Sequence, residues 1–427
     1  MRLIGTASTV FTLALTLGIS GIGPAPAAHE RRGHDQDRRG QDQDDDQQGE
    51  IHGGRQVREG QQIFRFDTFG DEQFWTNVLR MQEAVAQVSP ATALAVGLKV
   101  DVDALPASVV NALKAGQVNL NDPAVTIALL QLNAVLGIKG TVDSTGHLAT
   151  IGVTCALCHS TVDNSLTQGI GHRLDGWANR TLNVGAVVSL SPALAQPLKD
   201  LFLTWGPGRY DARHHIFDGT NLQILHPTTV PVEIPSIFGL KGVGFETYTA
   251  DGVISYWNAY VGISQMGGKG SFSDPRIGVT ITQTPDLVTP KLPALLAYQL
   301  SLREPSPPAR SFDEEAARRG RRLFRNEAGC ANCHQGNLFT DVLDVRGPDQ
   351  PLVHTPAEDG ADPAYAQRTA TGGYRTTPLR ALWQHPPYFH DGSAPDLLAV
   401  VNHYDQLFAL HLTAAQKADL VEYLKSI

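Results

Sequence analysis

Apolar side chains recur at helical spacing in the first part of the chain. Between residues 71 and 95 they fall at Phe74, Val78, Met81, Ala84 and Val85. A repeat of three to four residues places them on one face of an amphipathic helix. A short helix is predicted over residues 108–115. The pair Asp122-Pro123 predicts the start of a third helix, with residues 124–136 as its body and Gly137 and Gly140 beyond it.

From about residue 186 to residue 290 this pattern is lost. Gly and Pro interrupt the apolar runs, as in Gly206-Pro207-Gly208 and Ile234-Pro235. Loops of this length inside a folded chain usually line a site or supply a ligand. The sequence does not separate short strands from coil in this region.

Helical spacing returns over residues 291–302 and stops at a Pro-rich segment, residues 305–310, because proline cannot continue a helix. Ser311 and Glu314 then have the spacing of a capping box. The helix that they predict carries Gly320 and Phe324 on one face.

A last helix is predicted near the end of the chain. Thr413 is its expected N-cap, and its body covers residues 414–424. Its apolar positions are Leu420, Val421, Tyr423 and Leu424.

The N-terminus has the pattern of an export signal over residues 1–27. Arg2 precedes an apolar run that ends near Ile22, and Ala25-Pro26-Ala27 is a small-residue cleavage site. Residues 28–60 are polar and are expected to form a disordered tail. No later stretch is long and apolar enough for a spanning helix, so no stable membrane anchor is expected. The formal net charge of −9 argues against nucleic acid as a partner.

All four cysteines lie in two short motifs. Cys155 and Cys158 precede His159, and Cys330 and Cys333 precede His334. C-x-x-C-H is the attachment signature of c-type haem, in which the two thiols bind the haem and the histidine ligates the iron. Two covalently bound haem c groups are therefore predicted. The alternative is one zinc ion held by all four cysteines, which would leave both histidines without a role.

A further match lies in the second half. Residues 374–380 read Y-R-T-T-P-L-R, residues 387–393 read P-Y-F-H-D-G-S, and Leu397, Val400 and Val401 follow. This resembles the dihaem cytochrome c peroxidase and MauG-like family, in which R-T-P-x-L-R-N precedes P-Y-F-H-D-G-S. The chain departs from that pattern at Thr377, where the family has Pro, and at Ala381, where it has Asn.

The resemblance implies a mainly α fold with two cytochrome c-like haem domains. The first, residues 61–304, would be enlarged by N-terminal helices and long loops, and the second would cover residues 311–427. In class I cytochrome c domains a small residue and an aromatic residue mark the crossing of the first and last helices. Gly320 and Phe324 against Tyr423 and Leu424 would form this crossing.

The resemblance also implies a distal ligand for the second haem. The family places a Met or a Tyr fourteen residues after the P-Y-F-H histidine, and here that residue is Tyr404, with His403 as its rival. Arg375 and Arg380 are candidate partners of the haem propionates, since arginine pairs with carboxylates in a fork. His390 matches the family histidine and is a candidate catalytic residue, or it supports the tight turn that follows it.

The distal side of the first haem is left open between His172, Met266 and a vacant position. His214, His215 and His226 are further candidates. If the position is vacant, peroxide can bind there, and Glu233 is the candidate acid/base. Trp177 or Trp205 is a candidate electron relay between the haems, as a tryptophan is in the family that the chain resembles.

The sequence thus favours a periplasmic oxidoreductase that reduces hydrogen peroxide at one haem and passes electrons through the other. Its electron donor would be a small redox protein or a quinol-linked donor. The rival reading is a non-catalytic dihaem electron carrier. The resembled peroxidases also hold calcium between their domains, but no specific ligand set for calcium is evident in this sequence.

Overall fold

The computed structural model describes residues 53–343 and 350–427. The predicted export signal and most of the predicted tail lie outside these residues. A helix over residues 53–66 begins inside the predicted tail, so the folded chain starts earlier than residue 61. None of the helices in the described ranges is long and apolar enough to cross a membrane.

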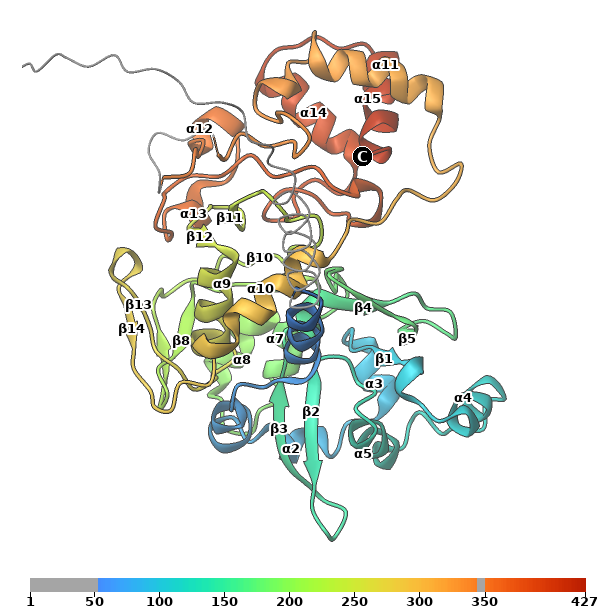
Figure 1. Cartoon of the computed structure of the whole chain (residues 1–427), viewed down its shortest axis with the longest axis vertical. Coiled ribbons are helices and arrows are strands. Elements are labelled where there is room, and N and C mark those ends of the chain that lie inside the picture. The colour runs from blue at the N-terminus through green and yellow to red at the C-terminus, as the bar shows by residue number, and fades with distance from the viewer. Residues whose placement is uncertain (1–52, 344–349) are drawn as a thin grey trace, which may run out of the picture. The chain divides into compact units, whose positions relative to one another are not determined.

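Short helices and long connections dominate the first part of the chain (Figure 1). After the helix over residues 53–66, the helical elements as far as the Pro-rich segment are η1 (Gln73–Val78), α2 (Met81–Val85), α3 (Pro90–Ala95), η2 (Val102–Ala104), α4 (Ala107–Lys114), α5 (Pro123–Gln131), α6 (Ala156–His159), α7 (Val184–Val188), α8 (Gln196–Leu203), α9 (Ile254–Tyr260), η3 (Val261–Gln265), η4 (Pro275–Ile277), η5 (Thr289–Lys291) and α10 (Leu292–Ser301).

The second part holds α11 (Glu314–Arg325), η6 (Cys330–Asn332), α12 (Pro356–Asp359), α13 (Pro363–Ala366), η7 (Leu382–Gln384), α14 (Leu397–Leu407) and α15 (Ala414–Lys425). No strand lies in this part of the described chain.

The strands form two-stranded sheets, which the sequence did not resolve. They are β1 (Val100–Asp101), β2 (Ile138–Val142), β3 (Leu148–Val153), β4 (Ser160–Val162), β5 (Ile170–Gly171), β6 (Arg173–Asp175), β7 (Arg209–Tyr210), β8 (His215–Phe217), β9 (Leu222–Ile224), β10 (Val232–Glu233), β11 (Phe245–Glu246), β12 (Gly252–Val253), β13 (Phe272–Asp274) and β14 (Val279–Ile281). The antiparallel pairs are β2–β3, β4–β6, β7–β10, β8–β9, β11–β12 and β13–β14, and β1 pairs with β5 in parallel.

Three helix predictions need correction. Residues 71–95 form η1, α2 and α3 instead of one helix, because Arg80 takes a left-handed backbone conformation and the Ser89 hydroxyl caps α3. The helix expected to reach residue 136 ends at Gln131, and residues 138–142 become β2. Asp313, not Ser311, caps α11, since its carboxylate accepts a hydrogen bond from the Ala316 N–H at 2.8 Å.

The predicted crossing of α11 and α15 is confirmed. The rings of Phe324 and Tyr423 meet edge to face with centroids 5.2 Å apart. A Cβ atom on Gly320 would lie only 2.0 Å from the Asp419 carbonyl oxygen. Glycine is therefore required for the close approach of the two helices. Thr413 and Gln416 form the capping box that starts α15.

The same crossing occurs in the first part of the chain. A Cβ atom on Gly60 would lie 1.9 Å from the Ala294 carbonyl oxygen, and the Phe64 and Tyr298 rings have centroids 5.4 Å apart. Gly60 and Phe64 have the spacing of Gly320 and Phe324. The helix over residues 53–66 and α10 thus repeat the arrangement of α11 and α15.

Two separate hydrophobic cores accompany the two crossings. One contains buried side chains between Ile63 and Tyr298 and the other contains buried side chains between Phe324 and Leu424. Each C-x-x-C-H motif packs at one of these cores. Each motif therefore has its own hydrophobic core beside it.

Candidate functional site

The second cysteine motif sits on a turn directly after α11. Gly329 takes the left-handed conformation, and η6 then carries Cys330. The His334 imidazole Nδ1 lies 3.0 Å from the Phe339 carbonyl oxygen. A carbonyl can only accept a hydrogen bond, so Nδ1 carries the proton and the lone pair of Nε2 is free to bind a metal. Burial lowers the pKa of His334, which keeps the imidazole neutral.

The first motif has the same arrangement. The β2–β3 hairpin leads into Cys155, and Gly137 lies so close to Leu157 that a Cβ atom would be 2.0 Å from its nitrogen. The His159 Nδ1 lies 3.0 Å from the Pro235 carbonyl oxygen, and burial lowers the pKa of His159 to about 4. Both motif histidines therefore present a neutral Nε2 with a fixed ring orientation.

A large cavity of about 960 Å³ surrounds the second motif. Cofactor sites in proteins occupy roughly 300–1,000 Å³. One wall carries Cys330, Cys333 and His334, and another is the face of α14 with Leu397, Val400, Val401 and Tyr404. The spacing of these α14 residues is three to four positions, which places them on one side of the helix.

Tyr404 and its neighbour His403, the two predicted candidates for the distal ligand, both border this cavity. The Tyr404 hydroxyl makes no hydrogen bond to any residue in the described ranges, and burial raises its pKa. The ring of His403, by contrast, is held by a 3.0 Å contact between its Nε2 and the Asp359 carbonyl oxygen. This contact fixes the orientation of the His403 ring and leaves the lone pair on its other nitrogen, Nδ1.

Three arginines line the same cavity, and each has a buried Nε–H without a hydrogen-bond partner in the described part of the chain. They are Arg180, Arg375 and Arg380. The hydroxyls of Ser236 and Thr247 are also buried there and unpaired. Unpaired buried donors are costly, so the cavity matches a group that is apolar in its body and carries carboxylates. A haem with its two propionates fits this description.

Arg375 also connects the two parts of the chain. Its guanidinium lies 3.0 Å from the Glu246 carboxylate, and both side chains are 8% exposed. Arg380 donates a hydrogen bond to the Asn337 carbonyl at 2.9 Å. Only part of each guanidinium is therefore left for a ligand. Arg180 was not singled out in the sequence, because no motif surrounds it.

Glu233 and His390, the two predicted catalytic residues, lie side by side. The Glu233 N–H donates a 2.7 Å hydrogen bond to the His390 carbonyl oxygen. The Glu233 carboxylate is buried and paired with the Arg180 guanidinium. Burial raises the pKa of Glu233 and the Arg180 charge opposes this shift. This arrangement favours a structural role for Glu233.

His390 is packed among tyrosines. Its ring centroid is 4.5 Å from that of Tyr374, and its Nε2 lies 3.1 Å from the Tyr374 hydroxyl. That hydroxyl donates its proton to the Asp362 carbonyl at 2.6 Å, so it accepts from His390 Nε2–H. Burial lowers the pKa of His390. The ring is thus neutral and engaged, as in a structural histidine.

The residues that could ligate the first haem on its distal side differ in their burial and in their contacts. His172 is exposed and its Nδ1 lies 2.9 Å from the Asp103 carboxylate, which gives no support to a ligand role. Met266 is buried in the first core, and its carbonyl accepts a 2.8 Å hydrogen bond from the Trp75 indole.

His215 is a buried alternative. Its Nε2 lies 3.4 Å from the Tyr210 hydroxyl, and its ring stacks on Trp205. Burial, together with the charges of Tyr260 and Cys158, raises the pKa of Tyr210. Tyr210 packs against the first core, as do Cys155 and Cys158.

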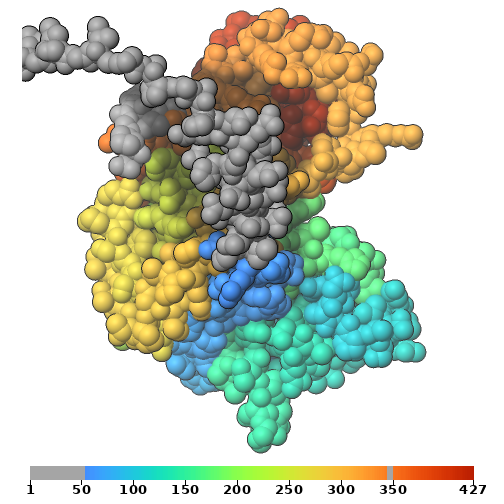
Figure 2. All heavy atoms as spheres, in the orientation of Figure 1, coloured from blue at the N-terminus to red at the C-terminus, as the bar shows by residue number. Residues whose placement is uncertain are grey.

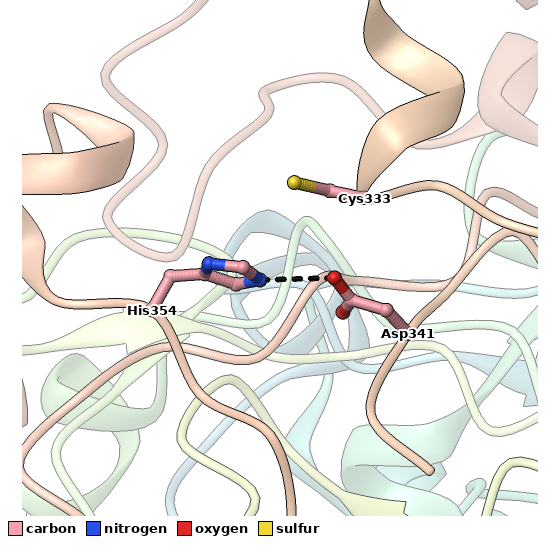
Figure 3. Close-up of side chains that lie close together, drawn as sticks. All are labelled: Cys333, Asp341 and His354. Carbon is pink, nitrogen blue, oxygen red and sulfur yellow. Dashed lines mark hydrogen bonds and ion pairs between the residues drawn. The ribbon is translucent and has the colours of Figure 1, made fainter. Parts of the chain in front are cut away.

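The four cysteines do not form a common zinc site. None of them forms a disulfide. Within the described ranges, the one group of closely spaced metal-binding side chains is Cys333, Asp341 and His354. Figure 3 shows the Asp341 carboxylate facing the His354 imidazole at 3.1 Å, with the Cys333 sulfur above them. A thiol and an imidazole do not suit calcium, which prefers oxygen ligands.

Comparison with known proteins places these motifs in context. No protein-family model matches the chain. It is 26% identical to the methylamine utilization protein MauG of Methylorubrum extorquens over 300 residues, which cover 64% of this chain and 72% of MauG. It is 29% identical to hydrazine synthase subunit gamma of Kuenenia stuttgartiensis over 32% of this chain and 49% of that subunit. It is 28% identical to the cytochrome-c peroxidase IdrP1 of a Pseudomonas species over 27% of this chain and 40% of that protein.

The chain therefore spans half or less of two of these three relatives. Among solved structures, a MauG-like protein associated with microbial copper homeostasis is 23% identical, covers 47% of this chain and 74% of its own, and has a TM-score of 0.34. The predicted resemblance is confirmed by the sequence relatives: over the part of its length that these alignments cover, the chain is similar to MauG and to cytochrome-c peroxidases.

Proposed function

We propose that this protein is an exported dihaem c-type cytochrome that reduces hydrogen peroxide at one haem and holds or transfers electrons at the other. The observation that carries the proposal is the shared geometry of His159 and His334. Each follows a C-x-x-C pair, and each has its Nδ1 fixed on a backbone carbonyl 3.0 Å away.

A bound haem c would supply an iron that exchanges electrons and binds peroxide at an open position. The side chains determine where each task takes place. Tyr404 and His334 both border the second cavity and would hold this haem as its protein ligands. An anionic oxygen ligand favours ferric iron, so this haem would store oxidising equivalents. The first haem, held by Cys155, Cys158 and His159, would be the peroxide site.

The residues around the second cavity would also hold the cofactor. Arg180, Arg375 and Arg380 would bind the propionates through the Nε–H groups that have no protein partner in the described ranges. The α14 face would cover the ring with apolar side chains. Since Glu233 and His390 are both engaged in protein contacts, we assign them to the support of this wall.

The test is peroxide turnover by the haem-loaded protein with a reduced cytochrome or dye as electron donor. We expect turnover in the wild type and in Tyr404→Phe, and loss of turnover in the Cys155→Ser/Cys158→Ser variant. The matched variant Cys330→Ser/Cys333→Ser should keep a peroxide-reactive first haem but lose multiple turnover. No turnover by the wild type, even after partial reduction, would overturn the proposal.

A second candidate is a non-catalytic electron carrier. The observation that favours it is the buried His215, which lies 3.4 Å from the hydroxyl of Tyr210, a residue that packs against the first core. If it caps the first iron, no open position remains. The low-temperature EPR spectrum of the oxidised protein separates the two candidates, because an open ferric iron gives a high-spin signal and two capped irons give low-spin signals.

The proposed compartment is the periplasm, since haem c is attached outside the cytoplasmic membrane. The proposed electron donor is a small redox protein or a quinol-linked donor. Calcium between the domains is also proposed, on the basis of the resemblance alone. Chelator treatment followed by metal analysis and peroxide assay would test it.

A further inference from the structure

The exposed face of α11 carries an unusual concentration of positive charge. Five of its twelve residues are arginine, in a chain whose formal net charge is −9. The buried residues of this helix are Ala316, Ala317, Gly320 and Phe324. Arg318, Arg321, Arg322 and Arg325 follow at intervals of three to four positions on the opposite side. We call these four residues the arginine stripe. The helix that carries it is labelled in Figure 1 and lies at the surface in Figure 2.

Most of the stripe is not used inside the protein. Arg318 lies 3.1 Å from Glu315, and Arg319, beside the stripe, is held by Asp419 at 2.7 Å. Arg321, Arg322 and Arg325 are exposed and form no ion pair with any residue of the described ranges. Cations in the last turn stabilise a helix through its dipole. The helix dipole accounts for one or two of the arginines near the C-terminal end of α11, but it does not explain four arginines on one face.

The stripe ends where the second cavity opens. The residues after α11 that line the cavity include Glu327, Gly329, Cys330 and Asn332. Glu327 and Asn332 are also exposed, so the cavity reaches the surface there. Glu327 is the acidic group on this rim. Phe408, on another wall, is 54% exposed. An exposed aromatic side chain with polar and charged residues around it is typical of a protein interface.

We propose that the arginine stripe is the docking surface for an acidic one-electron carrier protein, which it holds against the opening of the second cavity. This rests on the proposed function, because it requires a haem in that cavity. The carrier would lose one electron, and the haem bound through Cys330 and Cys333 would gain it. Complexes of this kind bury little area and are weak, so charge complementarity sets their rate of formation.

The first experiment measures binding and does not depend on turnover. An acidic flavodoxin is titrated into the oxidised, haem-loaded full chain by calorimetry at low and at physiological ionic strength. We expect the dissociation constant to rise at least about tenfold with salt, since exposed charges are screened over about 8 Å at 0.15 M. The variant Arg321→Glu/Arg322→Glu/Arg325→Glu should weaken binding at low salt by about tenfold or more.

The matched control changes the total charge by the same amount elsewhere. Arg55, Arg58 and Lys114 are exposed cations in the first part of the chain, and the variant Arg55→Glu/Arg58→Glu/Lys114→Glu should bind flavodoxin within about twofold of wild type. Circular dichroism and the haem absorption spectrum confirm that both variants are folded and loaded. Stopped-flow reduction by reduced flavodoxin should slow in the stripe variant alone.

Three outcomes would overturn the proposal. One is equal loss of binding in both variants, because this would reflect net charge alone. Another is preference for a basic cytochrome c over flavodoxin. The third is stripe-dependent binding to phosphatidylglycerol vesicles without binding to flavodoxin, which would make the stripe a membrane contact. If flavodoxin binds through the stripe but peroxide is not consumed, the docking surface stands and the peroxidase proposal fails.

Discussion

The indole rings of Trp177 and Trp383 meet edge to face, with centroids 5.9 Å apart and an interplanar angle of 81°. Trp177 follows Gly176, whose N–H donates a 2.8 Å hydrogen bond to the His159 carbonyl. Trp383 follows Leu382, which is buried in the second core. The contact therefore joins the surroundings of the two motif histidines. The sequence offered Trp177 as a relay without naming a partner, and Trp205 is instead stacked on His215 in the first core.

We expect Trp177→Leu and Trp383→Leu each to slow electron exchange between the two haems. A tenfold loss of rate corresponds to a rise of about 1.4 kcal/mol in the activation free energy. Stopped-flow spectroscopy after reduction of one haem would measure it. Trp257→Phe is the control, because its indole N–H has no hydrogen-bond partner in the described ranges. Equal rates in all variants would exclude this contact as the route.

Replacing Tyr404 should change the second haem and leave the first intact. Tyr404→Phe removes the oxygen that faces the cavity, so we expect a new ferric spectrum for one haem and a higher reduction potential. His403→Phe should preserve the spectrum, because His403 is bound to the Asp359 carbonyl. Optical and EPR titration of both variants shows whether Tyr404 or His403 is the ligand. The opposite result would make His403 the ligand.

The buried pair of Arg180 and Glu233 should respond unequally to single and double substitution. Their side chains are 16% and 3% exposed. Glu233→Gln leaves a guanidinium without its counter-charge, which costs about 3–5 kcal/mol of unfolding free energy. We expect the double variant Arg180→Met/Glu233→Leu to lose less unfolding free energy than Glu233→Gln. Urea denaturation followed by fluorescence measures both. If the Glu233→Gln protein is stable but does not turn over peroxide, Glu233 acts as the acid/base.

Adding a methyl group to the glycine at either helix crossing should destabilise the protein. Gly320→Ala and Gly60→Ala each place a carbon about 2 Å from a backbone carbonyl, and overpacking of this kind costs about 1–3 kcal/mol. Gly53→Ala, where nothing lies within 4 Å of the added carbon, should be neutral or slightly stabilising. Thermal unfolding compares the three variants. A stable Gly60→Ala protein would show that the first crossing can separate.

His215 should make the protein less stable in acid. Burial, with a smaller contribution from His214, lowers its pKa to about 3, whereas an unfolded histidine titrates near about 6.5. Between these values the unfolded chain binds the extra proton, so the unfolding free energy falls as the pH falls. One histidine contributes at most about 1.4 kcal/mol per pH unit in this window.

The variant His215→Gln should flatten this slope in denaturation experiments between about pH 4 and pH 6, which lie inside the expected window. His172→Gln is the contrasting case. The hydrogen bond and charge of Asp103 raise the pKa of the exposed His172, so its contribution is present below the unfolded pKa and is lost as the pH rises. An unchanged slope in His215→Gln would mean that other buried histidines dominate.

Local chemistry alone determined the cofactor prediction and several elements. Two C-x-x-C-H motifs hold all four cysteines, and their meaning depends only on adjacent residues. The helix predicted at residues 414–424, with Thr413 as its N-cap, is present, because a repeating apolar face and a side-chain cap act within a few residues. The crossing of Gly320 with the last helix was predicted from the resemblance to class I cytochrome c domains, and its steric reason became clear only in the structure.

Tertiary structure decided what distant residues do. No local signal places Arg180 beside Glu233, or Trp177 against Trp383, because each pair is joined by packing between segments separated by many residues. The first helix was missed for a related reason: its apolar residues Phe64 and Ile63 acquire meaning only against α10. The sequence suggested catalytic roles for the polar residues Glu233 and His390. Their burial and their hydrogen-bond partners depend on the whole fold, and these contacts favour structural roles instead.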